Sequence, residues 1–247
     1  MLRLKRLAVF CLFATCVISG LLFWALGQSG AAGLRGQAPP PQAGAKLAAL
    51  PDFSARAVDI TDSPVDPEWL ARTAKQTGIP ARALQAYAAA AELANTDTPA
   101  CRVGWNTVAA IGFVESGHGS HGGGTLSGTG QSSGPIIGPS LDGGGFAAIP
   151  DTDDGVLDGD AVWDRAVGPM QFIPTTWDLA GRDGNGDGIA DPLNIDDAAL
   201  SAASYLCRGG RDLTTAGGWS DAVLSYNQSD NYLRQVRDQA NEYAALP

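Results

Sequence analysis

The feature that most restricts this chain is a run of twenty mostly apolar residues without a charge, at residues 7–26. Twenty helical residues extend about 30 Å, which is the hydrocarbon thickness of a bilayer. Arg3, Lys5 and Arg6 precede the run, so we expect the N-terminus to stay in the cytoplasm and the rest to be exported. Residues 1–27 are therefore a membrane anchor or a signal peptide, and the length of the run favours a retained anchor.

The exported part divides into a linker and a folded domain. Residues 28–65 are rich in Gly, Ala, Pro and Gln and show little periodicity, which is typical of a linker. Asp66, followed by Pro and Glu, is a typical helix start. We expect the domain to span residues 66–247, with residues 117–150 forming a flexible Gly/Ser-rich surface loop.

The domain is expected to be mainly α. Apolar residues recur at helical spacing, and typical start and stop residues divide them into separate helices. No segment alternates in the manner of a β-strand. The expected helices cover residues 66–78, 80–95, 103–116, 175–180, 195–208, 219–227 and 232–245.

The charge of the chain excludes nucleic acid as a partner. Of the 16 basic residues, three precede the apolar run, so 13 remain beyond it against all 26 acidic residues. Binding to phosphates needs a basic surface, which this composition does not provide. The acidic balance fits calcium binding or a neutral substrate such as a glycan.

The four cysteines fall into two groups. Cys11 and Cys16 lie in the apolar run, whereas Cys101 and Cys207 lie in the domain. Disulfides persist in the oxidising compartments that exported proteins reach. We therefore expect a disulfide between Cys101 and Cys207, with two free buried thiols as the alternative.

Glu115 is one of only four glutamates in the chain, and it ends an apolar helical segment. Val108, Ile111 and Glu115 are three and four residues apart, so they share one helix face. Apolar surroundings and the negative end of the helix dipole both raise the pKa of a carboxyl group. A glutamic acid that is protonated near neutral pH can act as a general acid on a glycosidic bond. The alternative is an exposed glutamate without function at a frayed helix end.

Two further motifs follow Glu115 and Ser116. A Gly-Pro-Met-Gln-Phe segment at residues 168–172 leads into a helix, and Ser-Tyr-Asn at residues 225–227 follows a helical stretch. In this order, the three motifs resemble those of the lysozyme-like lytic transglycosylases. The sequence looks closest to the membrane-bound lytic transglycosylase B family in its actinobacterial form, over roughly residues 66–245.

The resemblance implies an activity and a role for each matching residue. The family cleaves peptidoglycan between N-acetylmuramic acid and N-acetylglucosamine, outside the cytoplasm, and leaves 1,6-anhydro ends. Glu115 would be the single catalytic acid and base, Tyr226 would lie near it, and Asn227 would lie near the bound sugar. The other implied substrate-binding residues are Ser116, Met170, Gln171 and Phe172.

The segment at residues 183–191 reproduces the start of an EF-hand calcium loop. Side-chain oxygens fall at loop positions 1, 3 and 5, a glycine at position 6 and a backbone carbonyl at position 7. Asn194 stands in place of the usual glutamate, and the family that the chain resembles closes a longer loop with a later aspartate, here Asp197. The expected ligands of a structural Ca²⁺ are Asp183, Asn185, Asp187, Ile189 and Asp197, with Asp191 and Asp196 in reserve.

Several alternatives stay open. The calcium loop could be an Asp/Gly-rich turn without metal, and the acidic segment at residues 151–160 is a weaker candidate for a second cation. His118 and His121 are expected to be exposed rather than to form a metal pair. The nearest rival activity is a hydrolytic muramidase in which one of the aspartates of the connecting segment, such as Asp164, positions water. The rival from another class is a non-catalytic, calcium-stabilised wall-binding module.

Overall fold

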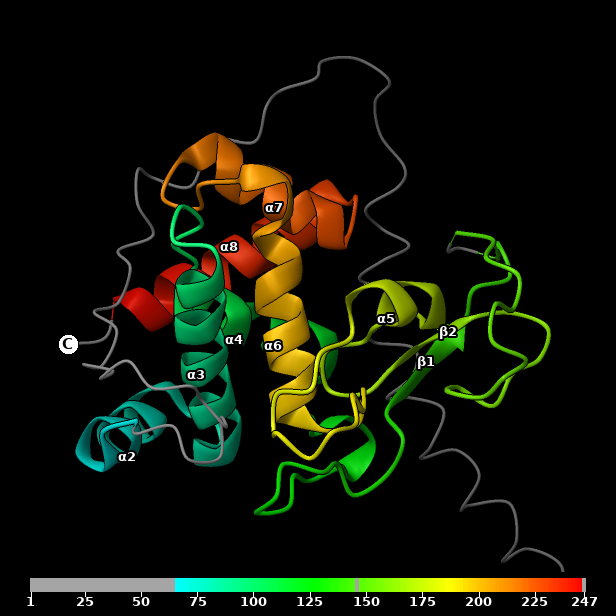
Figure 1. The fold of residues 1–247 in the computed structure, drawn as a ribbon, viewed down its shortest axis with the longest axis horizontal. Helices are drawn as coiled ribbons and strands as arrows, with labels where there is room; N and C mark the ends of the chain where they lie inside the picture. Colours follow the sequence, from blue (N-terminus) through cyan, green and yellow to red (C-terminus); the bar gives the residue numbers. More distant parts are fainter. Residues whose placement is uncertain (1–64, 145–146, 246–247) are drawn as a thin grey trace, which may run out of the picture. The chain divides into compact units, whose positions relative to one another are not determined.

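The structure is a computed structural model, of which residues 65–144 and 147–245 are described (Figure 1). The predicted anchor at residues 7–26 and nearly all of the predicted linker lie outside these residues. Among the helices of the described residues, none has the length and apolar character needed to cross a bilayer.

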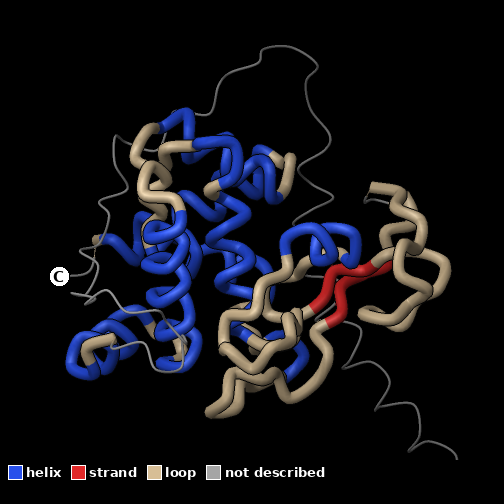
Figure 2. Tube along the Cα trace, viewed as in Figure 1, coloured by secondary structure: helices blue, strands red, loops and turns tan. Residues whose placement is uncertain are grey.

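The described domain is mainly helical, as the sequence predicts (Figure 2). Each predicted helix is present, with ends that differ by up to three residues. Two short 3₁₀-helices, η2 and η3, lie between the longer elements. The bounds are α2 Pro67–Thr77, α3 Ala81–Asp97, α4 Trp105–Ser116, η2 His121–Gly123, α5 Pro174–Ala180, α6 Ile195–Leu206, η3 Arg208–Gly210, α7 Ala216–Tyr226 and α8 Asp230–Ala244.

Capping residues set the ends of these helices. The Asp66 carboxylate accepts a hydrogen bond from the Glu68 N–H at 2.9 Å, and Gly78 ends α2 in the left-handed conformation. Thr215 and Ser229 cap α7 and α8 in the same way as Asp66 caps α2. Both helices therefore begin earlier than the first large apolar residue, which is where the prediction placed their starts.

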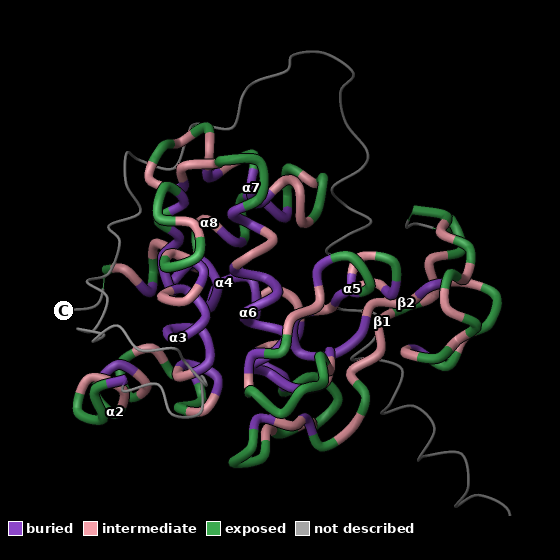
Figure 3. Tube along the Cα trace, viewed as in Figure 1, coloured by how far each residue is buried: buried purple, intermediate pink, exposed green. Residues whose placement is uncertain are grey.

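The core lies where α3, α4, α6 and α8 meet, and buried residues run along these helices in Figure 3. Helix α3 packs against α6 and α4, and α4 packs against α8. Alanines on the inner face of α3 let these neighbours approach closely. The predicted disulfide between Cys101 and Cys207 joins the segment before α4 to the end of α6.

Two short strands, β1 (Ile137–Ser140) and β2 (Arg165–Val167), form an antiparallel pair. The sequence analysis identified neither strand. The strands have only four and three residues, and β1 contains Gly138 and Pro139. An alternating pattern is not visible in segments so short, and glycine and proline argue against a strand in the sequence.

The Gly/Ser-rich segment after α4 is more structured than predicted. The Ser132 N–H donates a hydrogen bond to the Leu193 carbonyl at 3.0 Å, just ahead of α6. Arg82 of α3 donates to the Gly128 carbonyl at 3.0 Å and forms a partly buried ion pair with Asp196. The prediction of a flexible loop is wrong for this part of the segment, because partners distant in sequence hold it.

Candidate active site

Glu115 lies in the last turn of α4, at the end of a buried apolar stretch. The helix ends there because Gly117 takes the left-handed conformation, with φ of 58°, and its N–H bonds to the Phe113 carbonyl at 2.9 Å. The Glu115 side chain is half-buried. The structure therefore confirms the predicted position of Glu115 at the end of an apolar helix.

Tyr232, near the start of α8, donates a hydrogen bond from its hydroxyl to Glu115 Oε1 at 2.6 Å. Burial raises the pKa of Glu115 to about 7, and the hydrogen bond from Tyr232 lowers it by a smaller amount. A carboxyl group with this pKa exchanges a proton readily near neutral pH. The sequence analysis missed Tyr232, although its place at the start of the apolar face of α8 pointed to a buried hydroxyl.

Tyr226 ends α7 and lies near Glu115, as the resemblance implied. Its hydroxyl donates to the Met170 carbonyl at 2.7 Å rather than to Glu115. Burial is the main cause that raises the pKa of Tyr226 well above its ordinary value, and the negative charge of Glu115 is the next. Tyr226 therefore shares the surroundings of Glu115, but the direct contact is made by Tyr232.

The Gly-Pro-Met-Gln-Phe segment packs behind the end of α4. The Ser116 hydroxyl donates to the Pro169 carbonyl at 2.6 Å, which ties α4 to this segment. Met170 is fully buried, and Phe172 packs edge-on against Trp177 at 5.2 Å between ring centres. Ser116, Met170 and Phe172 are thus buried, so they shape the site from behind instead of offering side chains to a ligand.

Gln171 and Asn227 are the predicted sugar-binding residues that keep some exposure. Gln171 has φ of 50°, a strained value for a residue with a side chain, and its Nε2 donates to the Ile136 and Gly168 carbonyls at 2.8 and 2.9 Å. Asn227 is exposed just after α7, and its side chain forms no hydrogen bond to any described residue. Its amide can therefore both donate to and accept from a sugar.

The predicted calcium ligands lie in the loop between α5 and α6. Asp197 is buried and accepts hydrogen bonds from the Gly184 and Asp191 N–H groups at 2.7 and 2.9 Å. Asp183 accepts from the Gly186 and Gly188 N–H groups at 2.7 and 2.8 Å. These bonds hold the carboxylates of positions 1 and 15 in one compact turn.

Charge in this loop fits a hard cation. Burial raises the pKa of Asp197 to about 6, and the negative charge of Asp183 adds to the rise. A cation bound by both carboxylates would offset the burial and the repulsion together. Carboxylate, amide and carbonyl oxygens are the ligands that Ca²⁺ prefers, so the residues present fit this ion.

The two reserve ligands have other partners. Asp196 is fully buried and paired with Arg82 of α3. Asp191 accepts a hydrogen bond from the Gln131 side chain at 2.9 Å. Asp196 is therefore committed to an ion pair and not available to a metal.

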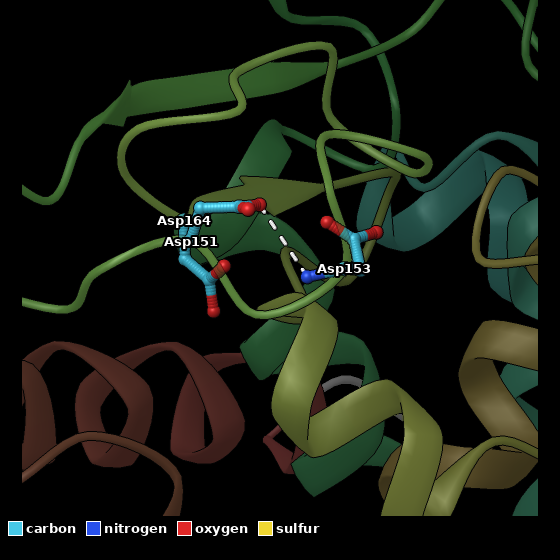
Figure 4. Close-up of side chains that lie close together, drawn as sticks. All are labelled: Asp151, Asp153 and Asp164. Carbon is cyan, nitrogen blue, oxygen red and sulfur yellow. Dashed lines mark hydrogen bonds between the residues drawn. The ribbon is translucent and has the colours of Figure 1, made fainter.

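A second group of carboxylates, Asp151, Asp153 and Asp164, precedes β2 (Figure 4). Their oxygens lie within 4.8 Å of one another. Asp164 is fully buried and accepts hydrogen bonds from the Thr152 N–H at 2.9 Å and from the Thr175 hydroxyl at 3.3 Å. Asp164 therefore holds the loop together through these bonds, which give no support to a role in positioning water.

The remaining acids of this segment do not join the cluster. Asp158 accepts a hydrogen bond from the Arg165 N–H at 2.6 Å, and Asp160 forms an ion pair with the Arg165 side chain at 2.8 Å. Within the acidic segment at residues 151–160, some aspartates therefore belong to the carboxylate cluster and others bind Arg165.

His118 differs most from its prediction. It is buried, with Nδ1 at 3.2 Å from the Tyr87 hydroxyl and Nε2 at 3.0 Å from the Tyr243 hydroxyl. Burial lowers the pKa of His118 to about 4, so its ring is neutral near pH 7. The expectation that His118 is exposed is wrong. Its neighbours in the sequence are glycines, whereas the two tyrosines that bury it are distant in the sequence. His121 is exposed, as predicted.

Comparison with protein families finds a match to part of the domain. A family model described as a transglycosylase SLT domain matches residues 157–219. The matched region includes the Gly-Pro-Met-Gln-Phe segment and the predicted calcium loop, whereas Glu115 lies before it and Tyr226 after it. This part of the chain is therefore similar to a transglycosylase SLT domain.

A solved structure gives a weaker likeness. The crystal structure of SltB3 from Pseudomonas aeruginosa, in complex with NAG-anhNAM-pentapeptide, aligns with 17% sequence identity and a TM-score of 0.43. The alignment covers 95% of this chain and 80% of that chain. This likeness is too weak to transfer residues from one protein to the other. Among curated proteins, no match is found.

Proposed function

We propose that this chain cleaves the β-1,4 bond between N-acetylmuramic acid and N-acetylglucosamine in peptidoglycan and leaves 1,6-anhydro-muramoyl ends. The observation that carries the proposal is the half-buried Glu115, with a pKa of about 7, bound by Tyr232 in a chain with a transglycosylase SLT domain. The activity would serve remodelling of the cell wall.

The chemistry needs one carboxyl group that first gives and then takes a proton. Protonated Glu115 donates its proton to the glycosidic oxygen, and the 2-acetamido group assists as the bond to the muramoyl carbon breaks. The Glu115 carboxylate then removes the proton from the muramoyl C6 hydroxyl, whose oxygen attacks the same ring carbon. Because the nucleophile belongs to the substrate, it has a high effective concentration, and no water is consumed.

The surroundings of Glu115 support this scheme. No carboxylate among the described residues contributes to the pKa shift of Glu115, which depends on burial and on Tyr232. Ordinary glycosidases use a second carboxylate as nucleophile or to activate water. Asp164, the candidate for that task in a hydrolytic muramidase, is fully buried and bound to threonines.

Tyr232 supports both halves of the cycle. Its hydroxyl is a donor to Glu115 Oε1, so it stabilises the carboxylate that forms once the proton has left. It also holds the carboxyl group in one orientation for proton transfer. Asn227, exposed after α7, would bind a polar group of the sugar.

Calcium and membrane attachment complete the proposal. A structural Ca²⁺ would be held by Asp183, Asn185, Asp187, the Ile189 carbonyl and Asp197, and would stabilise the loop that leads into α6. We place the enzyme outside the cytoplasm in the cell envelope, attached through the apolar run at residues 7–26 or released by its cleavage. A protein of the membrane-bound lytic transglycosylase B type would have this organisation.

The test is digestion of purified peptidoglycan by residues 52–247 with calcium present, followed by mass spectrometry of the products. Glu115→Gln runs in parallel, and Glu242→Gln, an exposed glutamate on α8, is the matched control. Products lighter by one water than reducing muropeptides, lost only with Glu115→Gln, support the proposal. Reducing ends would instead indicate a muramidase, and calcium-dependent pelleting without products would indicate a wall-binding module.

A further inference from the structure

His118 joins three helices at one point. It follows α4, and its two ring nitrogens contact the hydroxyls of Tyr87 on α3 and Tyr243 on α8, at 3.2 and 3.0 Å. Since a neutral imidazole has one donor and one acceptor nitrogen, one tyrosine accepts from the ring and the other donates to it. His118 thus uses its whole hydrogen-bonding capacity inside the protein.

The backbone of His118 also closes the end of α4. Its N–H donates to the Gly112 carbonyl at 2.9 Å, next to the bond from Gly117 to Phe113. His118 adopts φ of 61°, which is uncommon for a residue with a side chain and is held here by the two tyrosines. Glu115 lies in the turn that these bonds complete, so the same contacts fix its backbone.

Tyr87 lies directly against that turn. A side-chain carbon added at Gly112 would collide with the Tyr87 hydroxyl and lie 3.2 Å from the Met170 sulfur. Gly112 is three residues before Glu115, on the adjacent turn of the same helix. Only glycine at this position lets the Tyr87 hydroxyl lie so close to α4 while it contacts His118.

Tyr243 links His118 to the helix that carries Tyr232. Besides the His118 contact, α8 is bonded to α4 where the Asn106 side chain donates to the Ala240 carbonyl at 3.1 Å. The Tyr232–Glu115 hydrogen bond joins the same two helices near the other end of α8. The position of α8 along α4 therefore controls whether Tyr232 reaches Glu115.

We propose that His118 is a positioning residue for the catalytic acid: by binding Tyr87 and Tyr243, it fixes the end of α4 against α8 and so maintains the Tyr232–Glu115 hydrogen bond. The inference rests on the proposed function of Glu115. His118 would thus affect the rate of catalysis without taking part in the chemistry itself. The charge of the ring is not needed, since burial keeps His118 neutral near pH 7.

The test compares two variants in the intact protein, with calcium present. His118→Phe keeps an aromatic ring but removes both hydrogen bonds. Thr107→Val, also on α4, removes the buried bond from Trp219 Nε1 to the Thr107 hydroxyl, which measures 3.1 Å, at the end of the helix away from Glu115. Both variants should lose thermal stability, and only His118→Phe should lose catalytic efficiency.

The expected result is a fall in kcat of about tenfold or more for His118→Phe, with KM changed less than about twofold, because misplacement of a catalytic group acts mainly on the chemical step. The pKa of Glu115, followed by NMR of its side chain, should rise above about 7, because the hydrogen bond from Tyr232 that lowers it is weakened. Equal kcat and an unchanged Glu115 pKa, with the same loss of stability as Thr107→Val, would overturn the proposal.

Tyr243→Phe provides a second variant if His118→Phe does not fold. It retains His118 and the packed ring and removes only the hydroxyl contact to α8, so kcat and the Glu115 pKa should shift in the same direction by a smaller amount. Unchanged values for both would contradict the proposal. If the unaltered protein releases no anhydro products, the proposed function fails, while the NMR measurement still decides whether His118 controls Glu115.

Discussion

The helices around Glu115 and the loop-rich region between α4 and α6 are stabilised differently. In the first region, α3, α4 and α8 pack through apolar side chains, and buried polar contacts such as those of His118 join the helices at single points. In the second, carboxylates of the calcium loop and of the Asp151 cluster accept hydrogen bonds from nearby N–H groups. Helix packing thus positions the acid, whereas the loop-rich region is held by carboxylates that accept hydrogen bonds from the backbone.

The largest effect should come from Glu115→Gln, which tests the helical region alone. Loss of both the acid and the base should reduce turnover at least about a thousandfold, equivalent to about 4 kcal/mol. The melting temperature should not fall, because an amide at this half-buried position removes a group whose charge is disfavoured. Release of anhydro-muropeptides and calorimetry measure the two effects. Residual turnover within tenfold of the unaltered protein would exclude Glu115 as the acid.

Removal of the disulfide should have the next largest effect, on stability. The Cys101–Cys207 bond closes a long loop, with a sequence separation of 106 residues. The double variant Cys101→Ala and Cys207→Ala should lower the free energy of unfolding by about 2–5 kcal/mol, measured by urea denaturation. The unaltered protein in a reducing agent is the control and should show a similar loss.

Calcium should stabilise the loop-rich region. At calcium concentrations one hundred times the Kd, a single site adds about 2.7 kcal/mol of stability. The melting temperature should fall when a chelator is added, and Asp183→Asn should abolish this dependence. Asp178→Asn, an exposed aspartate on α5, is the matched control. A chelator without effect on the unaltered protein would refute the calcium site.

The smallest effect should come from Tyr232→Phe, which removes the hydroxyl bound to Glu115. A loss of one charge-assisted hydrogen bond predicts a fall in kcat of about tenfold. The rate of the unaltered protein should decline as pH rises through about 7, because the protonated form of Glu115 is lost. Since the bond from Tyr232 lowers the pKa of Glu115, the variant should show this decline at a higher pH.

The sequence predicted the helical region well and the loop-rich region poorly. Periodicity and caps located the helices, and Glu115 at the end of an apolar helix is where the sequence placed it. The strands were missed because β1 and β2 are short and β1 contains Gly138 and Pro139. Local sequence patterns predict helices, because helical hydrogen bonds join residues that are near in the sequence. They do not predict loops whose hydrogen-bond partners are distant in the sequence.

The same limit applies to the site. The Met170 carbonyl, not Glu115, accepts the bond from Tyr226, and only the fold shows that Tyr232 occupies the direct position. His118 lies among glycines in the sequence, so nothing nearby signals its two tyrosine partners on α3 and α8. The composition of the surrounding segment predicted that His118 is exposed, whereas tertiary contacts bury it.

The disulfide also divides the active site covalently. The ring closed by Cys101 and Cys207 contains Glu115 and the loop-rich wall, while α7 and α8, with Tyr226 and Tyr232, form a tail outside it. After a single proteolytic cut just after Cys207, only noncovalent packing of α7 and α8 would hold the two tyrosines beside Glu115. The active site is thus built from two covalent parts that a single peptide segment connects.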